Sequence, residues 1–374
     1  MASILERVEQ KVQQGERLSR EDALELFTTP DLIGLGRLAD QVKRARWGTH
    51  AHFVINRQIN PTNVCVLSCR FCDFATKRGR PNAYEMTIED VLAHCSPELR
   101  EVHIVGGLHP DWRWDYYLEM HRAIKRNFPQ IQIKAWTAVE IDYFSKKFRL
   151  SVEEVLRQLQ AAGLSALPGG GAEVFSERVR KALFPFKIGA PRWLEIHRIA
   201  HQLGIPTNST LLYGHMETYE ERVDHLVKLR DLQDEAEGFT PPDGAGFMSF
   251  IPLAYQPGKT QVVTRQTSAL EDLKTIAISR LFLDNIPHIK AYWVTMGEEI
   301  ASTALHFGAD DMDGTIGEER IMHAADAASP VALTRDRLVE LIQEADCIPV
   351  ERDALYRTVQ IYGDHARSES PVSQ

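Results

Sequence analysis

Residues 63–75 read Asn-Val-Cys65-Val-Leu-Ser-Cys69-Arg-Phe-Cys72-Asp-Phe-Ala, which places three cysteines in a CxxxCxxC spacing directly after an extended apolar segment. Three thiolates on one short loop can hold an iron–sulfur cluster, but a four-iron cube needs a ligand on every iron. One iron therefore keeps an open coordination position, where another molecule can bind and react. This stretch predicts a catalytic metal centre at the end of a first strand.

A structural zinc site is the main alternative for these cysteines. Such sites use four ligands, usually in two pairs of similar spacing, and no second pair follows in this chain. Cys95 and Cys347 stand alone and are interpreted as ordinary thiols. A second cluster would need three or four more thiolates. We therefore predict a single [4Fe–4S] cluster with Cys65, Cys69 and Cys72 as its ligands.

The composition is that of an ordinary globular chain. It has 374 residues, of which 44% are hydrophobic and 25% charged, and its formal net charge is −9. No cluster of lysine and arginine indicates a nucleic-acid-binding face, and no apolar run is long enough to span a membrane. Residues 1–7 lack the apolar core of a signal peptide, and free cysteines favour a reducing compartment. We expect a cytoplasmic protein with no nucleic-acid partner and no membrane span.

After residue 50, short β-branched runs alternate with helical patterns, which is typical of βαβ units and a parallel sheet. The runs predicted as strands are 53–60, 101–105, 132–137, 166–168, 207–213, 247–253, 289–294 and 302–307. Eight parallel strands can close a barrel, and the reactive groups of such a barrel follow the strand ends. The predicted fold class is therefore α/β, a (β/α)8 TIM-type barrel.

Helix starts between the strands support this count. A hydroxyl residue three positions before an acid predicts a capping box, and four such pairs begin at Thr87, Ser151, Thr218 and Ser268. A last helix is predicted at 334–345, before a short extended segment at 347–350.

The chain divides into three parts. Apolar residues recur with a period near four over residues 3–48, and Ser19 with Asp22 predicts a further helix start there. We expect an N-terminal helical extension at 1–50, a barrel core at 51–350 and a C-terminal tail at 351–374, frayed after His365. The Gly- and Pro-containing segment 234–246 is predicted to be a surface loop.

With this spacing and position, the cysteine stretch resembles the motif of the radical S-adenosylmethionine (SAM) superfamily. The resemblance implies that the amino and carboxylate groups of SAM chelate the open iron, and that the reduced cluster splits SAM into methionine and a 5′-deoxyadenosyl radical. It also implies an aromatic residue near the adenine, at Phe71. Gly106-Gly107 matches a turn that binds the SAM amino group, although Leu108 replaces the usual glutamate.

Two further strand ends are candidate SAM contacts. In Pro168-Gly-Gly-Gly-Ala-Glu173, the carboxylate of Glu173 could accept hydrogen bonds from a ribose diol or an ammonium group. Leu212 to Glu217 resembles the superfamily stretch that packs on adenine, with Leu212 and Gly214 at the ligand and Glu217 settling the loop. A plain turn at Gly106-Gly107 and a solvated Glu173 are the structural alternatives.

Seven longer stretches resemble the aminodeoxyfutalosine synthase family of menaquinone biosynthesis, in the futalosine pathway: 52–75, 101–112, 137–148, 166–189, 193–221, 250–260 and 308–319. This resemblance implies a C–C bond-forming transferase that adds the radical to the enol ether of 3-[(1-carboxyvinyl)oxy]benzoate. Aryl migration and loss of a carboxylate as bicarbonate then give 6-amino-6-deoxyfutalosine. SAM is thus a co-substrate, and a flavodoxin or ferredoxin is the implied electron donor.

The substrate is a small dicarboxylate, so cations or backbone amides must face the cavity. The candidates by placement are Arg57, His109, His215 and Lys290, each of which could equally be a surface charge or a core histidine. Asp310, Asp311 and Asp313 follow the predicted eighth strand. We expect them to orient substrate or close the mouth, with a divalent-metal site as the alternative.

Two other functions stay open. The cyclic dehypoxanthinyl futalosine synthases and the deazaflavin-forming radical SAM synthases share the barrel and the Gly-Ala-Asp-Asp stretch at 308–311. A non-catalytic metal-binding module that docks a partner protein is an alternative of another class, and it predicts no cleavage of SAM.

Overall fold

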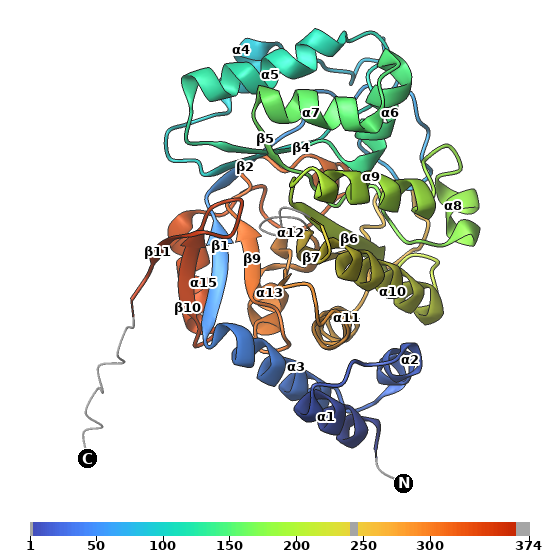
Figure 1. The fold of residues 1–374 in the computed structure, drawn as a ribbon, viewed down its shortest axis with the longest axis vertical. Coiled ribbons are helices and arrows are strands. Elements are labelled where there is room, and N and C mark those ends of the chain that lie inside the picture. The colour runs from blue at the N-terminus through green and yellow to red at the C-terminus, as the bar shows by residue number, and fades with distance from the viewer. Residues whose placement is uncertain (1–2, 240–245, 364–374) are drawn as a thin grey trace.

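The computed structural model describes residues 3–239 and 246–363, and Figure 1 shows its fold. The strands are β1 (His50–Val54), β2 (Asn56–Ile59), β3 (Glu101–Ile104), β4 (Gln132–Ala135), β5 (Leu164–Ala166), β6 (Thr207–Tyr213), β7 (Phe247–Ala254), β8 (His288–Ile289), β9 (Asp311–Gly314), β10 (Ile348–Arg352) and β11 (Thr358–Ile361). The helices are α1 (Ile4–Gln14), α2 (Arg20–Thr28), α3 (Leu32–Trp47), α4 (Ile88–Ala93), α5 (Trp114–Asn127), α6 (Ala138–Phe148), α7 (Val152–Ala162), α8 (Glu177–Leu183), α9 (Ala190–Gln202), α10 (Tyr219–Ala236), α11 (Ala269–Phe282), α12 (Trp293–Met296), α13 (Glu298–Ala304), α14 (Ile321–Ala324) and α15 (Arg335–Glu344). None of these helices is long and apolar enough to cross a membrane.

Parallel strands close into the expected barrel. Three sheets contain the parallel neighbours β2-β3-β4-β5, β6-β7-β8 and β9-β1. Single parallel bridges join them, from Leu167 to Thr207 and from Lys290 to Asp311. Because β1 and β2 are consecutive halves of one interrupted strand, the circuit contains eight strand positions. The predicted α/β barrel is confirmed.

The predicted positions of the later strands were partly wrong. Residues 302–307, expected as the eighth strand, instead lie at the end of α13 and in the turn after it. Ala301, Ala304 and Leu305 are fully buried, and their spacing of three and one puts them on one face of a helical turn. The eighth strand is β9, whose acidic residues give it no strand-like composition.

Strand bounds also differ at three other positions. Of the run predicted at 289–294, only Ile289 lies in a strand, the two-residue β8, and the end of the run lies in the short helix α12. β5 ends at Ala166, where the strand predicted at 166–168 was expected to begin. The predicted first strand is broken at Ile55 into β1 and β2.

Three of the four predicted capping boxes are confirmed, and the fourth, at Ser268, has only the hydroxyl half of the pair. Thr87, Ser151 and Thr218 cap α4, α7 and α10 with reciprocal side-chain bonds, and the Ser268 hydroxyl accepts the Glu271 amide at the start of α11. Each cap satisfies backbone N–H groups that have no partner within the helix.

Segments at the two chain ends complete the outer layer. Helix α2 packs against both α10 and α11, and α3 packs along α11, at the lower end of the molecule in Figure 1. β10 adds in parallel to β1, and β11 pairs with β10 in antiparallel. The division of the chain at residues 50 and 350 remains a proposal, and β10 runs through the second boundary. The predicted frayed tail after residue 365 lies outside the described residues, as do residues 240–245 of the surface loop predicted at 234–246. The start of that predicted loop is wrong, because residues 234–236 form the end of α10.

Alternation along the strands decides which side chains enter the barrel. On β3, Val102 and Ile104 are fully buried in the hydrophobic core, while His103 between them lines an internal cavity. The same alternation brings polar side chains from several strands into the barrel interior.

Candidate active site at the mouth of the barrel

A cavity of about 290 Å³ opens at the ends of the strands, and all three motif cysteines line it. Predicted SAM contacts from four separate segments line the same cavity: Phe71, Gly106, Gly107, Glu173 and Leu212. Gly214 does not line it. The barrel therefore brings together eight of the nine predicted site residues, from positions up to 147 residues apart in the chain.

The cysteine loop is fixed through its backbone. The Lys77 ammonium donates to the carbonyls of Cys65, Val66 and Leu67 at 2.9, 3.1 and 2.7 Å. The Arg70 amide donates to the Leu183 carbonyl at 2.7 Å, which joins the loop to the end of α8. These bonds hold the loop without using its sulfur atoms, so the thiols remain available as ligands.

The electrostatics of the thiols fit a metal centre. Burial raises the pKa of Cys69 to about 11, although the Lys187 ammonium opposes this rise. Burial also raises the pKa of Cys72, against hydrogen bonds from the amides of Ala75 and Phe74. Without metal these thiols keep their protons, and a metal that binds them displaces the protons. Three free, half-buried thiols on one cavity wall fit an iron–sulfur cluster with one ligand position left open.

The Gly106-Gly107 turn lies directly against the chain that leads into the cysteine loop. The Gly107 amide donates to the Thr62 carbonyl at 2.8 Å, and the Gly106 amide donates to the Glu140 carboxylate at 2.9 Å. A Cβ atom on Gly107 would lie 2.2 Å from the Val64 carbonyl oxygen. The absence of side chains here therefore allows two segments of this chain to pass each other, besides opening the cavity wall.

Replacing Gly107 by alanine is expected to lower SAM cleavage about a hundredfold, because the cysteine loop must shift by a large part of an ångström to admit the methyl group. The rate of 5′-deoxyadenosine formation after anaerobic reconstitution measures this. Gly238→Ala is the control, because its Cβ would meet only the Glu235 carbonyl oxygen, at an ordinary 3.5 Å. An unchanged rate in Gly107→Ala would show that the turn does not position the loop.

Glu173 is held in the cavity wall rather than solvated. Its backbone has a left-handed φ of +48°, and its carbonyl oxygen accepts the Leu212 amide at 2.8 Å. Its carboxylate forms a partly buried ion pair with Lys187, whose ammonium lies 5.0 Å from the centre of the Phe71 ring. Burial alone would lower the pKa of Lys187, but Glu173 and the Cys69 thiol together raise it, so this lysine stays charged beside the cysteines.

Glu217 holds the loop after β6 in place through hydrogen bonds, as predicted. Its carboxylate accepts the amides of Gly214 and His215 at 2.6 and 2.9 Å, and Arg222 donates to it at 2.8 Å. Gly214 has φ of +86°, and a Cβ there would lie 2.1 Å from the Thr267 methyl group. Gly214 therefore shapes the turn, while Leu212 supplies the apolar surface in the cavity.

The predicted cations lie elsewhere. None of the four candidates lines the cavity: Arg57, His109, His215 and Lys290. For example, the His109 ring accepts the Asp111 and Trp112 amides and lies 3.0 Å from Glu85. Instead, the cationic side chains in the cavity wall are Lys187 and, on β4, Lys134.

The acidic residues of β9 are paired with buried cations. Asp311 bonds to Arg352 at 2.6 Å, and Asp313 lies 3.4 Å from Lys290. Asp313 lines the cavity, whereas Asp310 and Asp311 do not. Of the three acids expected to orient substrate or close the mouth, only Asp313 is therefore placed where it can contact a bound substrate.

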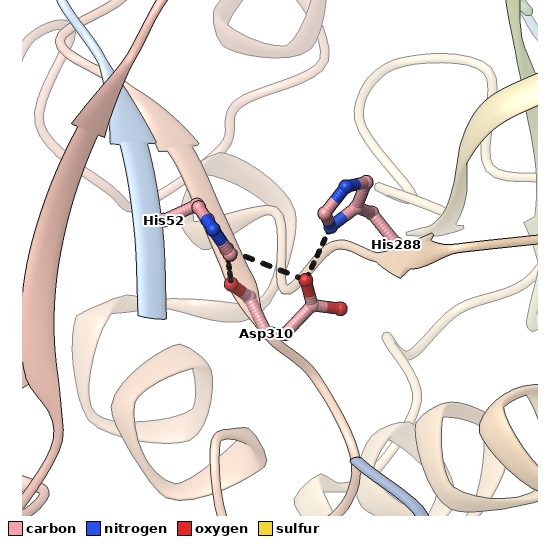
Figure 2. A group of neighbouring side chains, drawn as sticks. All are labelled: His52, His288 and Asp310. Atoms are coloured by element: carbon pink, nitrogen blue, oxygen red, sulfur yellow. Dashed lines mark hydrogen bonds and ion pairs between the residues drawn. The ribbon is translucent and has the colours of Figure 1, made fainter. Parts of the chain in front are cut away.

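Figure 2 shows Asp310 between His52 and His288, a grouping whose ligand atoms are close enough to surround an ion. Protein donors already use these atoms: His288 Nδ1 bonds to the carboxylate at 2.6 Å, and Arg280 pairs with its other oxygen. His52 Nδ1 lies 3.0 Å from the Asp310 carbonyl oxygen. The Arg280 guanidinium supplies the positive charge that a metal ion would otherwise bring to Asp310. This grouping is therefore a charge-balanced buried network.

Two family models match this chain. The radical SAM superfamily matches residues 59–229, and the CofH/MqnC C-terminal region matches residues 244–364. Among solved structures, methylornithine synthase (PylB) superposes with a TM-score of 0.72 at 17% identity, over 92% of this chain and 97% of that one. This last likeness concerns the fold alone.

Relatives of nearly the same length include two aminodeoxyfutalosine synthases. The one from Thermus thermophilus is 48% identical over 95% of this chain and 96% of its own. The one from Streptomyces coelicolor is 43% identical over 99% and 98%. A cyclic dehypoxanthine futalosine synthase from Streptomyces coelicolor is 38% identical over 96% and 90%.

Proposed function

This chain belongs to the radical SAM superfamily and, within it, to the aminodeoxyfutalosine synthase family of menaquinone biosynthesis, and we propose the following reaction for it. The 5′-deoxyadenosyl radical from SAM adds to the methylene carbon of 3-[(1-carboxyvinyl)oxy]benzoate. The products are 6-amino-6-deoxyfutalosine, methionine and bicarbonate. The observation that carries this proposal is that three free thiols and five of the six predicted SAM contacts line one cavity.

We propose that Cys65, Cys69 and Cys72 hold one [4Fe–4S] cluster. When bound and reduced, this cluster supplies the electron that splits SAM into methionine and the radical. Cys95 and Cys347 lie outside the cavity lining, which supports a single cluster.

We also propose that Phe71 and Leu212 contact the adenine of SAM, and that the Gly106-Gly107 turn and Glu173 contact its polar groups. Their common position in the cavity wall supports these roles. Apolar side chains also line the cavity, among them Val105, Ile251 and Leu253. Such a wall keeps water and stray hydrogen donors away from a primary carbon radical until it meets the substrate.

A flavodoxin or ferredoxin in the cytoplasm is the proposed electron donor. These donors are small acidic proteins, and three exposed cations of the cysteine loop region would complement one: Arg70, Lys77 and Arg80. The three lie within fifteen residues of every proposed cluster ligand, so a donor bound there would be near the cluster.

A sister reaction is the second candidate, because the C-terminal family model is named after CofH and MqnC. Product analysis separates the two. The protein is reconstituted anaerobically, reduced, and given SAM with the enolpyruvyl benzoate labelled with ¹³C in its enolpyruvyl carboxylate. We expect one nucleoside adduct and one labelled bicarbonate for each methionine, by mass spectrometry. Free 5′-deoxyadenosine without adduct would favour a sister enzyme, and intact SAM would favour a binding module.

A further inference from the structure

A row of polar side chains crosses the inner wall of the barrel below the cysteine loop. Gln58 on β2 is paired in register with His103 on β3, and His103 with Lys134 on β4. Residues in register on neighbouring strands point to the same face of a sheet, and all three side chains line the cavity. We call these three residues the polar row.

The polar row lies deep in the cavity. His103 precedes Gly106 by three residues on the same strand path, which corresponds to roughly 10 Å at about 3.3 Å per residue. Gly106 lies level with the cysteine loop, because its turn packs against residues 62–64. An elongated ligand whose one end reacts near the cysteines would therefore place its other end at the polar row.

Several donors at this depth lack acceptors. Gln58 Nε2 donates to the Tyr292 hydroxyl at 2.9 Å, which leaves the phenolic proton free, and Tyr292 also lines the cavity. Among the described residues, the Lys134 ammonium, with three donors, has one partner, Glu101 at 2.7 Å. Within residues 3–239 and 246–363, neither the phenolic proton nor the His103 ring has a hydrogen-bond partner.

The carboxylates near the polar row already have partners: Glu319, which also lines the cavity and acts on Tyr292, accepts from the His323 ring and from the amides of residues 321–323. Glu101 is paired with Lys134, Asp313 with Lys290, and both pairs are buried. Burial, reinforced by Lys134, lowers the pKa of His103 to about 4, so its ring is neutral and keeps one N–H donor. A carboxylate placed here would meet a cation and two neutral donors without breaking an existing ion pair.

We propose that the polar row, together with Tyr292, is the binding subsite for the ring carboxylate of the aromatic substrate. This inference rests on the proposed function, in which the enol-ether end of the substrate must meet the radical near the cysteines. The ring then separates that end from the benzoate carboxylate, which extends down the barrel to Tyr292, His103 and Lys134. The subsite replaces the four cations predicted from the sequence, all of which lie outside the cavity.

The test compares the full substrate with 2-phenoxyacrylate, the analogue that lacks only the ring carboxylate. Tyr292→Phe removes one hydroxyl and should raise KM for the full substrate about tenfold, because a hydrogen bond to a charged group is lost. It should leave KM for the analogue unchanged. His103→Asn should behave in the same way, and calorimetric titration of the reconstituted enzyme should show the same tenfold loss of substrate affinity.

Tyr116→Phe is the matched control, because this phenol donates to the Met86 carbonyl at 2.5 Å outside the cavity. Equal losses for substrate and analogue, or no loss for either, would overturn the subsite while the wild-type adduct still upheld the proposed function. If the wild-type enzyme forms no adduct, the proposed function fails and the subsite with it. Lys134 is left intact in these variants, because its removal would strand the buried Glu101.

Discussion

Replacing Cys69 by alanine is expected to abolish both the brown chromophore of the cluster and the cleavage of SAM. Two thiolates would then have to hold a cube that needs three protein ligands, and the loop offers no substitute sulfur. The Lys187 ammonium also interacts electrostatically with Cys69, so the substitution removes one partner of this cation. Iron content, absorbance near 400 nm and formation of 5′-deoxyadenosine measure the effect, with turnover expected to fall below detection.

Two cysteines elsewhere in the chain give the matched controls. The Cys95 thiol donates to the Val91 carbonyl at 3.6 Å, and Cys347 is buried beside the Lys43 ammonium at 3.8 Å. Cys95→Ser and Cys347→Ser should therefore retain the chromophore and the activity. Loss of the cluster in either variant, or turnover retained by Cys69→Ala, would show that the ligand assignment is wrong.

Local rules predicted the helix starts better than the strands. A cap such as Thr87 with Asp90 acts within four residues, so its signal is complete in the sequence. β9 has no such signal, because its acids become strand residues only when distant cations neutralise them. Arg352 lies 41 residues from Asp311, and nothing in the local pattern joins them.

The sequence predicted those site residues that belong to a motif on one loop. It did not predict those whose position depends on how separate strands pair. The three cysteines and Gly106-Gly107 were recognisable because their spacing carries the chemistry. Lys134 was missed because its orientation depends on the register of β4 against β3, which only the assembled sheet fixes. Lys187 pairs with Glu173, which lies 14 residues earlier, on the other side of α8 in the sequence. No helical or strand period predicts a contact at this separation.

Only the structure shows which of the histidines near the strand ends face the cavity. His109 follows a strand end and is chemically able to bind a carboxylate, yet its ring nitrogens are used by the turn at 111–112 and by Glu85. His103, two residues before the end of the predicted strand, offered no motif at all. Its position between the core residues Val102 and Ile104 is what directs it into the barrel.

The buried network around Asp310 leads to the second large expected effect. Asp310→Asn should lower the free energy of unfolding by about 3–5 kcal/mol, because it leaves the fully buried Arg280 guanidinium without its counter-charge. The same change removes the acceptor charge for His288, which packs between Trp47 and Tyr356. Asp111→Asn is the control: its partner Arg78 is exposed, and such pairs contribute at most about 1 kcal/mol.

The pH dependence of this effect has a definite sign. His288 and Arg280 hold the pKa of Asp310 well below its ordinary value of 3.8 in the folded protein, despite burial, which acts the other way. The stabilisation by the carboxylate is therefore complete above the unfolded pKa and is lost as the pH falls through 3.8 towards the folded pKa. Unfolding in guanidinium chloride measures the free energy of unfolding of the wild type and of Asp310→Asn. The difference between the two free energies should be large and constant between pH 6 and 8 and should narrow below about pH 4. A difference that stays unchanged into acid would mean that the charge of Asp310 does not stabilise the barrel, and that its side chain acts by packing and neutral hydrogen bonds alone.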